Sequence, residues 1–190
     1  KCHRGNTFLV ELINNDIVPE MEGTNWVPDP THGTPHNGSF GNEVHRRITQ
    51  RLAGNQRYLA DVLIDTNTAQ IMNIGAGISG HGDIVQIDVI ALEDGYRPVA
   101  GDILDRNRVK FAFEIKTGIG GAVNPGQRAA YADIFGVDKF RSLASIRQWQ
   151  PHTGWRDVPK VKARARGYMV LNSNATRKLR GGGPMLLAAT

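Results

Sequence analysis

The stretch Phe111–Lys116 reads Phe-Ala-Phe-Glu-Ile-Lys, and it decides the fold. Its apolar residues predict a strand, in which side chains alternate between two faces, so Glu114 and Lys116 share one face. An acid and a base in an otherwise apolar strand are costly to bury unless they are paired or used. The preceding stretch Gln86–Leu92 repeats the anomaly, with one acid, Asp88, among apolar neighbours. Both stretches therefore predict strands that carry functional groups.

Antiparallel pairing of these two strands would bring Asp88 beside Glu114. Two carboxylates and the carbonyl of Ile115 form an oxygen-rich site that suits a hard divalent cation. Lys116 would stand next to that cation, where it can orient or deprotonate a water or stabilise charge on a phosphate. Asp83 competes with Asp88 as the metal ligand, but its odd offset of five residues puts it on the opposite strand face. The sequence therefore favours Asp88.

Further elements flank this pair of strands. Asn42 can cap a helix that Gly54 is placed to end. Apolar residues recur on one face of this helix at spacing four: Val44, Ile48 and Leu52. The segment Tyr58–Ile64 is apolar and stays open between strand and helix. Further along, strands are predicted at 84–92, 109–117 and 167–171, and a helix at 126–135. The chain is therefore expected to be α/β, with helix, strand, strand and helix at its centre.

Composition bounds the number and class of domains. The 190 residues suffice for one domain, and 40% hydrophobic with 22% charged residues excludes global disorder. The single cysteine, Cys2, excludes an internal disulfide. Prolines and glycines interrupt the first forty residues, where only Thr7–Ile17 could form a short element. We therefore expect residues 1–40 to be an irregular leader or a wrapping arm, and 41–190 to be the functional domain. No apolar run approaches the roughly 20 residues that span a bilayer, so no membrane partner is expected.

The net charge of +5 is unevenly distributed. Segment 156–180 holds eight basic residues and one acid, a net +7, which leaves −2 for the rest of the chain. A basic segment suits a polyanion, because each neutralised phosphate releases counterions, although a solvated basic surface is an equally good explanation. The candidate phosphate contacts are Lys160, Lys162, Arg164 and Arg166. The aromatic residues beside them could stack bases, but core packing is favoured for at least two of the three: Trp149, Trp155 and Tyr168.

An acid, a hairpin-length gap and then Glu-x-Lys in a hydrophobic strand resemble the PD-(D/E)xK nuclease superfamily, the family of restriction endonucleases and of many repair and toxin nucleases. The resemblance implies a restriction-endonuclease-like core, a mixed central sheet flanked by helices, that hydrolyses phosphodiester bonds with Mg²⁺, or with Mn²⁺ as an alternative. It identifies Asp88 and Glu114 as metal ligands and Lys116 as the catalytic lysine. The proline that names the motif is absent, since Ile87 precedes Asp88.

Two flanking residues extend the resemblance, which covers Gly41–Phe135. Members often supply a further acid from an upstream helix, and Glu43 fits that place as a third metal ligand. Its alternative role is that of a first-turn acid facing the positive end of the helix dipole. Members also often carry a catalytic glutamine on the helix after Glu-x-Lys, where Gln127 lies. Tyr131, four residues later, could share the active-site face of that helix, and Arg128 is a candidate nucleic-acid contact.

Four other interpretations compete with a metal-dependent nuclease. Gly75–Gly80 is a literal GxGxxG, but a strand follows it where a dinucleotide fold needs a helix, so no nicotinamide cofactor is expected. His32 and His36 lie in a proline-broken loop, where helical pairing around a metal is not available. Glu43 and His45 could act as base and acid of a metal-independent ribonuclease, although helix positions two apart diverge. A catalytically inactive nucleic-acid-binding module on the same fold is the remaining alternative.

The sequence thus predicts a magnesium-dependent phosphodiesterase, a deoxyribonuclease in preference to a ribonuclease. The irregular leader, the basic C-terminal portion and a start at Lys1 without a signal segment resemble a toxin domain at the C-terminus of a secreted bacterial polymorphic effector. That resemblance implies secretion by the producing cell and action in the cytoplasm of a target cell. It also implies a cognate immunity protein that blocks the site in the producer.

Overall fold

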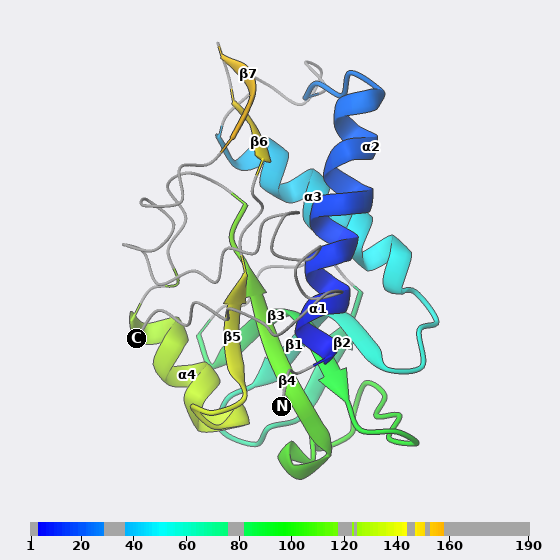
Figure 1. The fold of residues 1–190 in the computed structure, drawn as a ribbon. Helices are drawn as coiled ribbons and strands as arrows, with labels where there is room; N and C mark the ends of the chain where they lie inside the picture. The colour runs from blue at the N-terminus through cyan, green and yellow to red at the C-terminus, as the bar shows by residue number, and fades with distance from the viewer. Residues whose placement is uncertain are drawn as a thin grey trace. The chain divides into compact units, whose positions relative to one another are not determined.

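The computed structural model describes residues 4–28, 37–75, 82–117, 123, 125–143, 147–150 and 153–157. Its elements appear in Figure 1. The helical elements are α1 (Arg4–Glu11), the π-helix η1 (Leu12–Ile17), α2 (Val18–Gly23), α3 (Asn37–Leu52), the 3-10 helix η3 (Arg106–Arg108) and α4 (Pro125–Phe135). The strands are β1 (Tyr58–Asp65), β2 (Ile71–Ile74), β3 (Ile84–Leu92), β4 (Val109–Ile115), β5 (Phe140–Leu143), β6 (Arg147–Gln150) and β7 (Gly154–Asp157).

The chain divides into two compact units. Unit 1 takes the described residues of Lys1–Arg47, Lys116–Ala122 and Ser142–Thr190. Unit 2 takes those of Ile48–Ile115 and Val123–Arg141.

Five strands form a mixed sheet in the order β2-β1-β3-β4-β5. β1 pairs antiparallel with β2 and with β3, and β3 pairs antiparallel with β4. β4 and β5 run parallel, because their backbone hydrogen bonds, from Ala112 N to Lys139 O and from Lys116 N to Leu143 O, advance by four residues on both strands. A parallel pair needs a crossover connection, and α4 supplies it. The predicted mixed α/β class is therefore confirmed.

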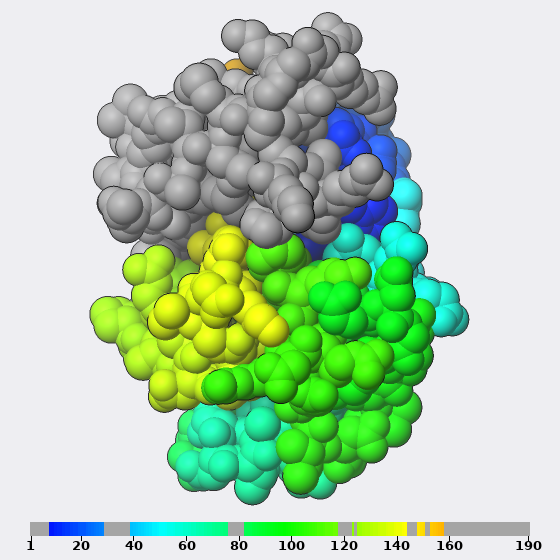
Figure 2. All heavy atoms as spheres, turned by 60° about the horizontal axis from the view of Figure 1, so that its bottom comes forward, coloured from blue at the N-terminus to red at the C-terminus, as the bar shows by residue number. Residues whose placement is uncertain are grey.

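Helix α4 packs against the sheet of unit 2 through its buried side. Tyr131, Ile134 and Phe135 lie in one apolar cluster with Ile90 of β3 and Ala112 of β4. Fully burying one such large side chain contributes about 1.5–3 kcal/mol to stability, so α4 is held firmly on these strands. Figure 2 shows the green segment 82–117 and the yellow-green to yellow segment 125–143 side by side on one surface.

The N-terminal segment is helical from Arg4 to Gly23, which includes the short element allowed at Thr7–Ile17, so the prediction of an irregular chain is wrong only for residues 4–6 and 18–23. Pro19 suggested a break, because proline lacks an N–H and its ring clashes with the carbonyl four residues back. The π-helix η1 immediately before it widens the helix, and Val18 N–H donates to Ile13 O, five residues back. The helix therefore continues past Pro19. It buries Leu9, Val10, Leu12, Ile13, Ile17, Val18 and Met21.

Helix α3 begins at Asn37, five residues before the predicted cap at Asn42, and ends at Leu52. The predicted apolar face is confirmed, since three of its side chains are buried: Val44, Ile48 and Leu52. Gly54 follows with a φ of 71°, a left-handed conformation that glycine adopts easily at the end of a helix. The segment Tyr58–Ile64, for which the sequence allows either a strand or a helix, forms strand β1. The strand predicted at 167–171 lies outside the described residues.

Aromatic side chains link the β6–β7 hairpin to the rest of unit 1. Trp149 packs edge-on against Trp26 with ring centroids 5.8 Å apart, and Trp155 packs in the same way against Phe40 at 5.6 Å. Trp26 and Phe40 complete the chain of rings at 6.2 Å. The predicted packing role is therefore confirmed for two of the three aromatic residues. Tyr168 lies outside the part of the chain that the structure describes.

Candidate functional site

The register of β3 and β4 brings two acids face to face in unit 2. Val89 pairs with Phe113 and Ile90 pairs with Ala112, so the next position places Asp88 opposite Glu114. Residues opposite one another in an antiparallel pair point to the same face of the sheet. The Ile115 N–H donates to Asp88 Oδ2 over 2.5 Å. The expected antiparallel pairing is thus present, and it sets the two carboxylates side by side.

Glu114 is buried, with 3% of its surface exposed, and Tyr131 of α4 contacts it. The Tyr131 hydroxyl lies 3.0 Å from Glu114 Oε2 and 2.6 Å from the carbonyl oxygen of Gln86. Gln127, one helical turn earlier, donates from Nε2 to the same hydroxyl over 3.4 Å. Gln127 and Tyr131 therefore share the helix face that meets the carboxylates, as their spacing of four predicts.

Tyr131 keeps its proton and acts as a donor. Burial raises the pKa of its hydroxyl far above the ordinary value, and the negative charges of Glu114 and Asp88 raise it further. A protonated phenol can donate to a carboxylate, whereas a phenolate would repel it. The hydroxyl therefore supports Glu114 from within the core and helps to fix the direction of its carboxylate.

Tyr131→Phe should weaken both the fold and the site. The ring stays in the core, but Glu114 loses a buried hydrogen bond, which costs about 1–3 kcal/mol of the free energy of unfolding. With Glu114 in its predicted role as a metal ligand, the affinity for Mg²⁺ should fall by about 10- to 100-fold, because supporting bonds of this kind hold metal ligands in place. Urea unfolding and calorimetric titration measure the two effects. Tyr96→Phe is the matched control, because the Tyr96 hydroxyl accepts from Asp105 N elsewhere in unit 2. Equal behaviour of the two variants would contradict the role given to Tyr131.

The donor set of Asp88 and Glu114 can be compared with that of a magnesium site. Among the described residues, no three His, Cys, Asp or Glu side chains form a group that could hold a metal. Mg²⁺ is usually bound through one or two carboxylates, with water and substrate phosphate in the other positions. Asp88 and Glu114 provide this donor set. One oxygen of each carboxylate is oriented by a hydrogen bond, from Ile115 N–H and from the Tyr131 hydroxyl.

Lys116 belongs to unit 1, two residues beyond Glu114 in the chain. Its N–H donates to Leu143 O over 2.8 Å, and its side chain is half-buried. The next residue, Thr117, is 2% exposed, and its Oγ1 has no hydrogen-bond partner. A Cβ built on Gly41 of α3 would lie 2.8 Å from this oxygen. Glycine at position 41 therefore allows α3 to approach the residue that follows the predicted catalytic lysine.

Gly41→Ala should destabilise unit 1. An added Cβ at 2.8 Å from Thr117 Oγ1 overpacks the contact, which costs about 1–3 kcal/mol. That cost exceeds the roughly 1 kcal/mol that alanine gains over glycine inside a helix. Combining it with Thr117→Ala removes the obstructing oxygen, so the double variant should regain most of the lost free energy of unfolding. A single Gly41→Ala variant with wild-type stability in urea would disprove the close contact.

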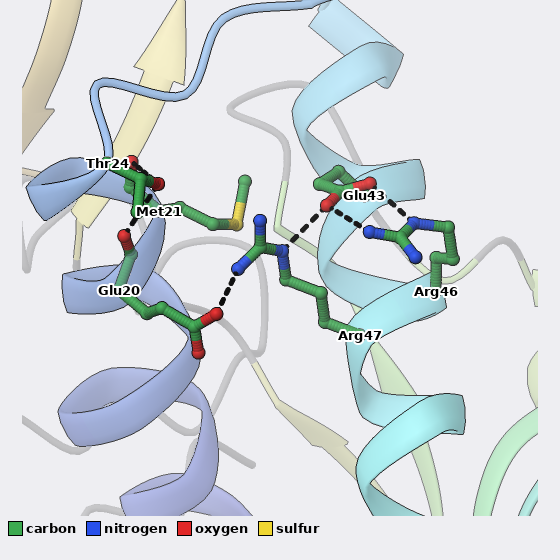
Figure 3. A network of polar contacts seen from close by, with 6 residues as sticks. All are labelled: Glu20, Met21, Thr24, Glu43, Arg46 and Arg47. Carbon is green, nitrogen blue, oxygen red and sulfur yellow. Dashed lines mark hydrogen bonds and ion pairs between the residues drawn. The ribbon is translucent and has the colours of Figure 1, made fainter.

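Glu43 is held by two arginines of its own helix within unit 1 (Figure 3). Arg46 donates to both oxygens, from Nε over 2.7 Å and from Nη2 over 2.6 Å. Arg47 donates from Nε to Glu43 over 2.6 Å and from Nη1 to Glu20 of α2 over 2.8 Å. The four side chains form an ion-pair network between α2 and α3. The alternative first-turn role at the helix N-terminus does not describe Glu43, because α3 begins six residues before it.

Burial raises the pKa of Glu43, but the hydrogen bonds and charges of Arg46 and Arg47 outweigh it, so the pKa is lowered from its ordinary 4.5. A carboxylate whose pKa falls on folding contributes stability above its ordinary pKa and loses it as the pH drops through the folded value. Glu43→Gln should therefore cost stability at pH 7, by about 1 kcal/mol because Arg46 is half exposed. The difference from the wild type should shrink as the pH falls below the ordinary pKa of glutamate.

Urea unfolding at several pH values measures this effect. Glu20→Gln is the control, because it removes one partner of Arg47 and leaves Glu43 with both arginines. Its effect at pH 7 should be smaller. A pH-independent difference between Glu43→Gln and the wild type would rule out an ionic contribution.

Other predicted residues lie away from the carboxylate pair or outside the described residues. Asp83 is exposed just before β3, and its carbonyl accepts from Thr66 N over 2.7 Å. Arg128 is exposed on α4. No helix in the described ranges is long and apolar enough to cross a bilayer. Predicted residues outside those ranges are His32, His36, Lys160, Lys162, Arg164, Arg166 and positions 76–80 of the GxGxxG stretch.

Sequence reasoning passed over one acid beside the pair, Asp61 of β1. The pairs Ala60–Val89 and Val62–Ile87 place Asp61 at the position opposite Asp88. Its φ of 57° lies in the left-handed region, which is uncommon for any residue other than glycine. An acid within the apolar segment 58–64 is the same signal that singles out Asp88. It does not identify Asp61 from the sequence alone, because that segment is compatible with both a strand and a helix.

Comparisons of this chain with protein-family models, with curated proteins and with solved structures gave no match.

Proposed function

We propose that this chain is a metal-dependent nuclease that hydrolyses phosphodiester bonds, with DNA as the preferred substrate and a restriction-endonuclease-like core. One observation carries the proposal: Asp88 and the buried Glu114 oppose each other on adjacent strands, and the Tyr131 hydroxyl of α4 donates to Glu114 while Gln127 donates to that hydroxyl. A buried acid with a second acid across the sheet is costly to maintain for stability alone. Active sites are where such arrangements recur.

Each residue has a proposed part in the reaction. Asp88 and Glu114 would hold Mg²⁺, or Mn²⁺, which polarises the phosphate and lowers the pKa of a bound water. The Tyr131 hydroxyl keeps the Glu114 carboxylate in place. Gln127 would orient the phosphate or the lysine. Lys116, which follows Glu114 by two residues, would orient the attacking water or stabilise negative charge on the phosphate.

Glu43 would be a third metal ligand only if a metal ion displaced its arginine partners. Both of its oxygens accept hydrogen bonds from arginine in this structure, so a metal ion would have to compete with Arg46 and Arg47. The same contacts weigh against the metal-free ribonuclease with Glu43 as the base. Catalysis by a general base is most efficient when its pKa is near the working pH, and the arginines lower the pKa of Glu43.

We also propose that the chain is a toxin domain of a secreted bacterial effector. A toxin domain of a secreted bacterial effector would act in the cytoplasm of the target cell, and its producer would need an immunity protein. Basic residues in segment 156–180 and Arg128 would contact backbone phosphates of the substrate.

Cleavage assays test the proposal directly. Plasmid DNA and total RNA are incubated with the protein, with and without EDTA, and then with Mg²⁺ restored. We expect DNA to be cut, EDTA to stop the reaction and Mg²⁺ to restore it. Cleavage of RNA that survives EDTA would favour the metal-independent ribonuclease. Binding of DNA without any cleavage, across Mg²⁺ and Mn²⁺, would favour the inactive binding module.

A further inference from the structure

We propose that Asp61 is a positioning residue of this site, acting on Glu114 through Gln86 and Tyr131. The inference rests on the proposed function and adds a residue from a third strand, β1. Its basis is a continuous chain of polar contacts. Gln86 Nε2 donates to Asp61 Oδ1. The carbonyl oxygen of the same Gln86 lies 2.6 Å from the Tyr131 hydroxyl, which lies 3.0 Å from Glu114 Oε2.

The backbone of Asp61 is held in an unfavourable conformation. Its φ of 57° occurs within β1, while the pairs on either side, Ala60–Val89 and Val62–Ile87, keep the ladder in register. The turn of the backbone directs the Asp61 carbonyl to Gly75 N, at 2.8 Å. A left-handed residue that is not glycine persists only where its surroundings hold it, and such residues cluster at functional sites.

The negative charge of Asp61 explains why its side chain needs a hydrogen-bond partner. Counting between the pairs Ala60–Val89 and Val62–Ile87 places Asp61 across from Asp88 on the neighbouring strand. Two carboxylates that are close neighbours repel one another. The side-chain amide of Gln86 donates to the Asp61 carboxylate, and this hydrogen bond holds Gln86 in place on β3. The backbone carbonyl of Gln86 and the Glu114 carboxylate both compete for the single proton of the Tyr131 hydroxyl. The position of Gln86, and through it Asp61, therefore determines how strongly Tyr131 donates to Glu114.

Two substitutions separate this role from a purely structural one. Asp61→Asn retains an oxygen that can accept from Gln86, and asparagine tolerates the left-handed region. Asp61→Gly suits the backbone better than aspartate does but removes the acceptor. A role confined to the backbone conformation of Asp61 predicts that glycine is at least as good as the wild type. A positioning role predicts that asparagine preserves function and that glycine loses it although the protein is folded.

The first measurement does not depend on catalysis. The NMR signal of the Tyr131 ring carbon that bears the hydroxyl is followed in the metal-free protein, assigned by its loss in Tyr131→Phe. We expect this signal to move in Asp61→Gly and to stay in place in Asp61→Asn. A wild-type signal in Asp61→Gly, with folding confirmed by circular dichroism, overturns the proposal. A failure of the wild type to cleave nucleic acid would remove the proposed function and leave this result to decide the role of Asp61.

The second measurement uses the Mg²⁺-loaded protein. In Asp61→Gly, kcat should fall by about 10- to 100-fold, the effect typical of a group that supports a metal ligand, while KM is unchanged. Asp61→Asn should restore kcat to within a few-fold of the wild type. Loss of Mg²⁺ binding in both variants, to the extent seen in Asp88→Asn, would make Asp61 a metal ligand and overturn the positioning role.

Discussion

Asp88→Asn and Glu114→Gln are each expected to lower the rate of DNA cleavage by about 10³-fold or more. Asp88 on β3 lies opposite Glu114 on β4, and either substitution removes one of their two negative charges. A hard divalent cation depends on charged oxygen ligands. Calorimetric titration should show weaker Mg²⁺ binding in both variants. Each variant should stay folded, because the substitution keeps the shape of the side chain and relieves the repulsion between two acids.

Asp83→Asn is the matched control for this experiment. Asp83 is exposed at the start of the same strand region, five residues before Asp88, and should keep nearly full activity and Mg²⁺ affinity. An inactive Asp83→Asn together with an active Asp88→Asn, both folded, would move the metal ligand to Asp83. Cleavage by Glu114→Gln at the wild-type rate would show that Glu114 is not the acid of a Glu-x-Lys nuclease motif.

Lys116→Ala is expected to lower the cleavage rate by roughly 10²- to 10⁴-fold, the range for loss of a positioned proton donor or acceptor. Its effect should differ in kind from that of the carboxylates, because Mg²⁺ affinity should stay near the wild-type value and the protein should remain folded. The backbone contact of Lys116 with Leu143 O does not involve the side chain, so it survives the substitution.

Lys110→Ala provides the comparison on β4. Lys110 forms ion pairs with Glu93 at 3.3 Å and Asp94 at 3.8 Å, and it should be dispensable for cleavage. Single-turnover assays with excess protein measure the chemical step for both variants. A Lys116→Ala variant that cuts as fast as Lys110→Ala would show that this lysine takes no part in the reaction.

The central strands could be predicted because their signals are local. Apolar runs around Asp88 and Glu114 define β3 and β4, and burial makes a lone acid in such a run conspicuous. The facing of Gln127 and Tyr131 follows from helix geometry alone, since residues four apart share a face. These features depend on neighbours within a few positions, and the structure places them together in unit 2.

Most features that sequence reasoning missed depend on contacts distant in the chain or on a single backbone conformation. The pairing of Glu43 with Arg46 and Arg47 follows a local helix spacing, but the contact of Arg47 with Glu20, 27 residues away, is one that no local spacing reveals. The π-helix before Pro19 compensates for a residue that is ordinarily a reliable sign of a helix end. The left-handed φ of Asp61 occurs between residues that pair regularly with β3, and nothing in its immediate sequence neighbours indicates it.

The chain of rings formed by Trp149, Trp26, Phe40 and Trp155 has a spectroscopic consequence. The protein has three tryptophans, and all three lie in unit 1, whereas Tyr58, Tyr96 and Tyr131 lie in unit 2. Intrinsic fluorescence excited at the red edge of tyrosine absorption therefore reports the melting of unit 1 alone. Loss of structure around Asp88 and Glu114 would go undetected in that signal, and far-ultraviolet dichroism would register it through the sheet. Two melting curves that separate under these probes would mean that the units unfold independently, and coincident curves would mean one cooperative transition.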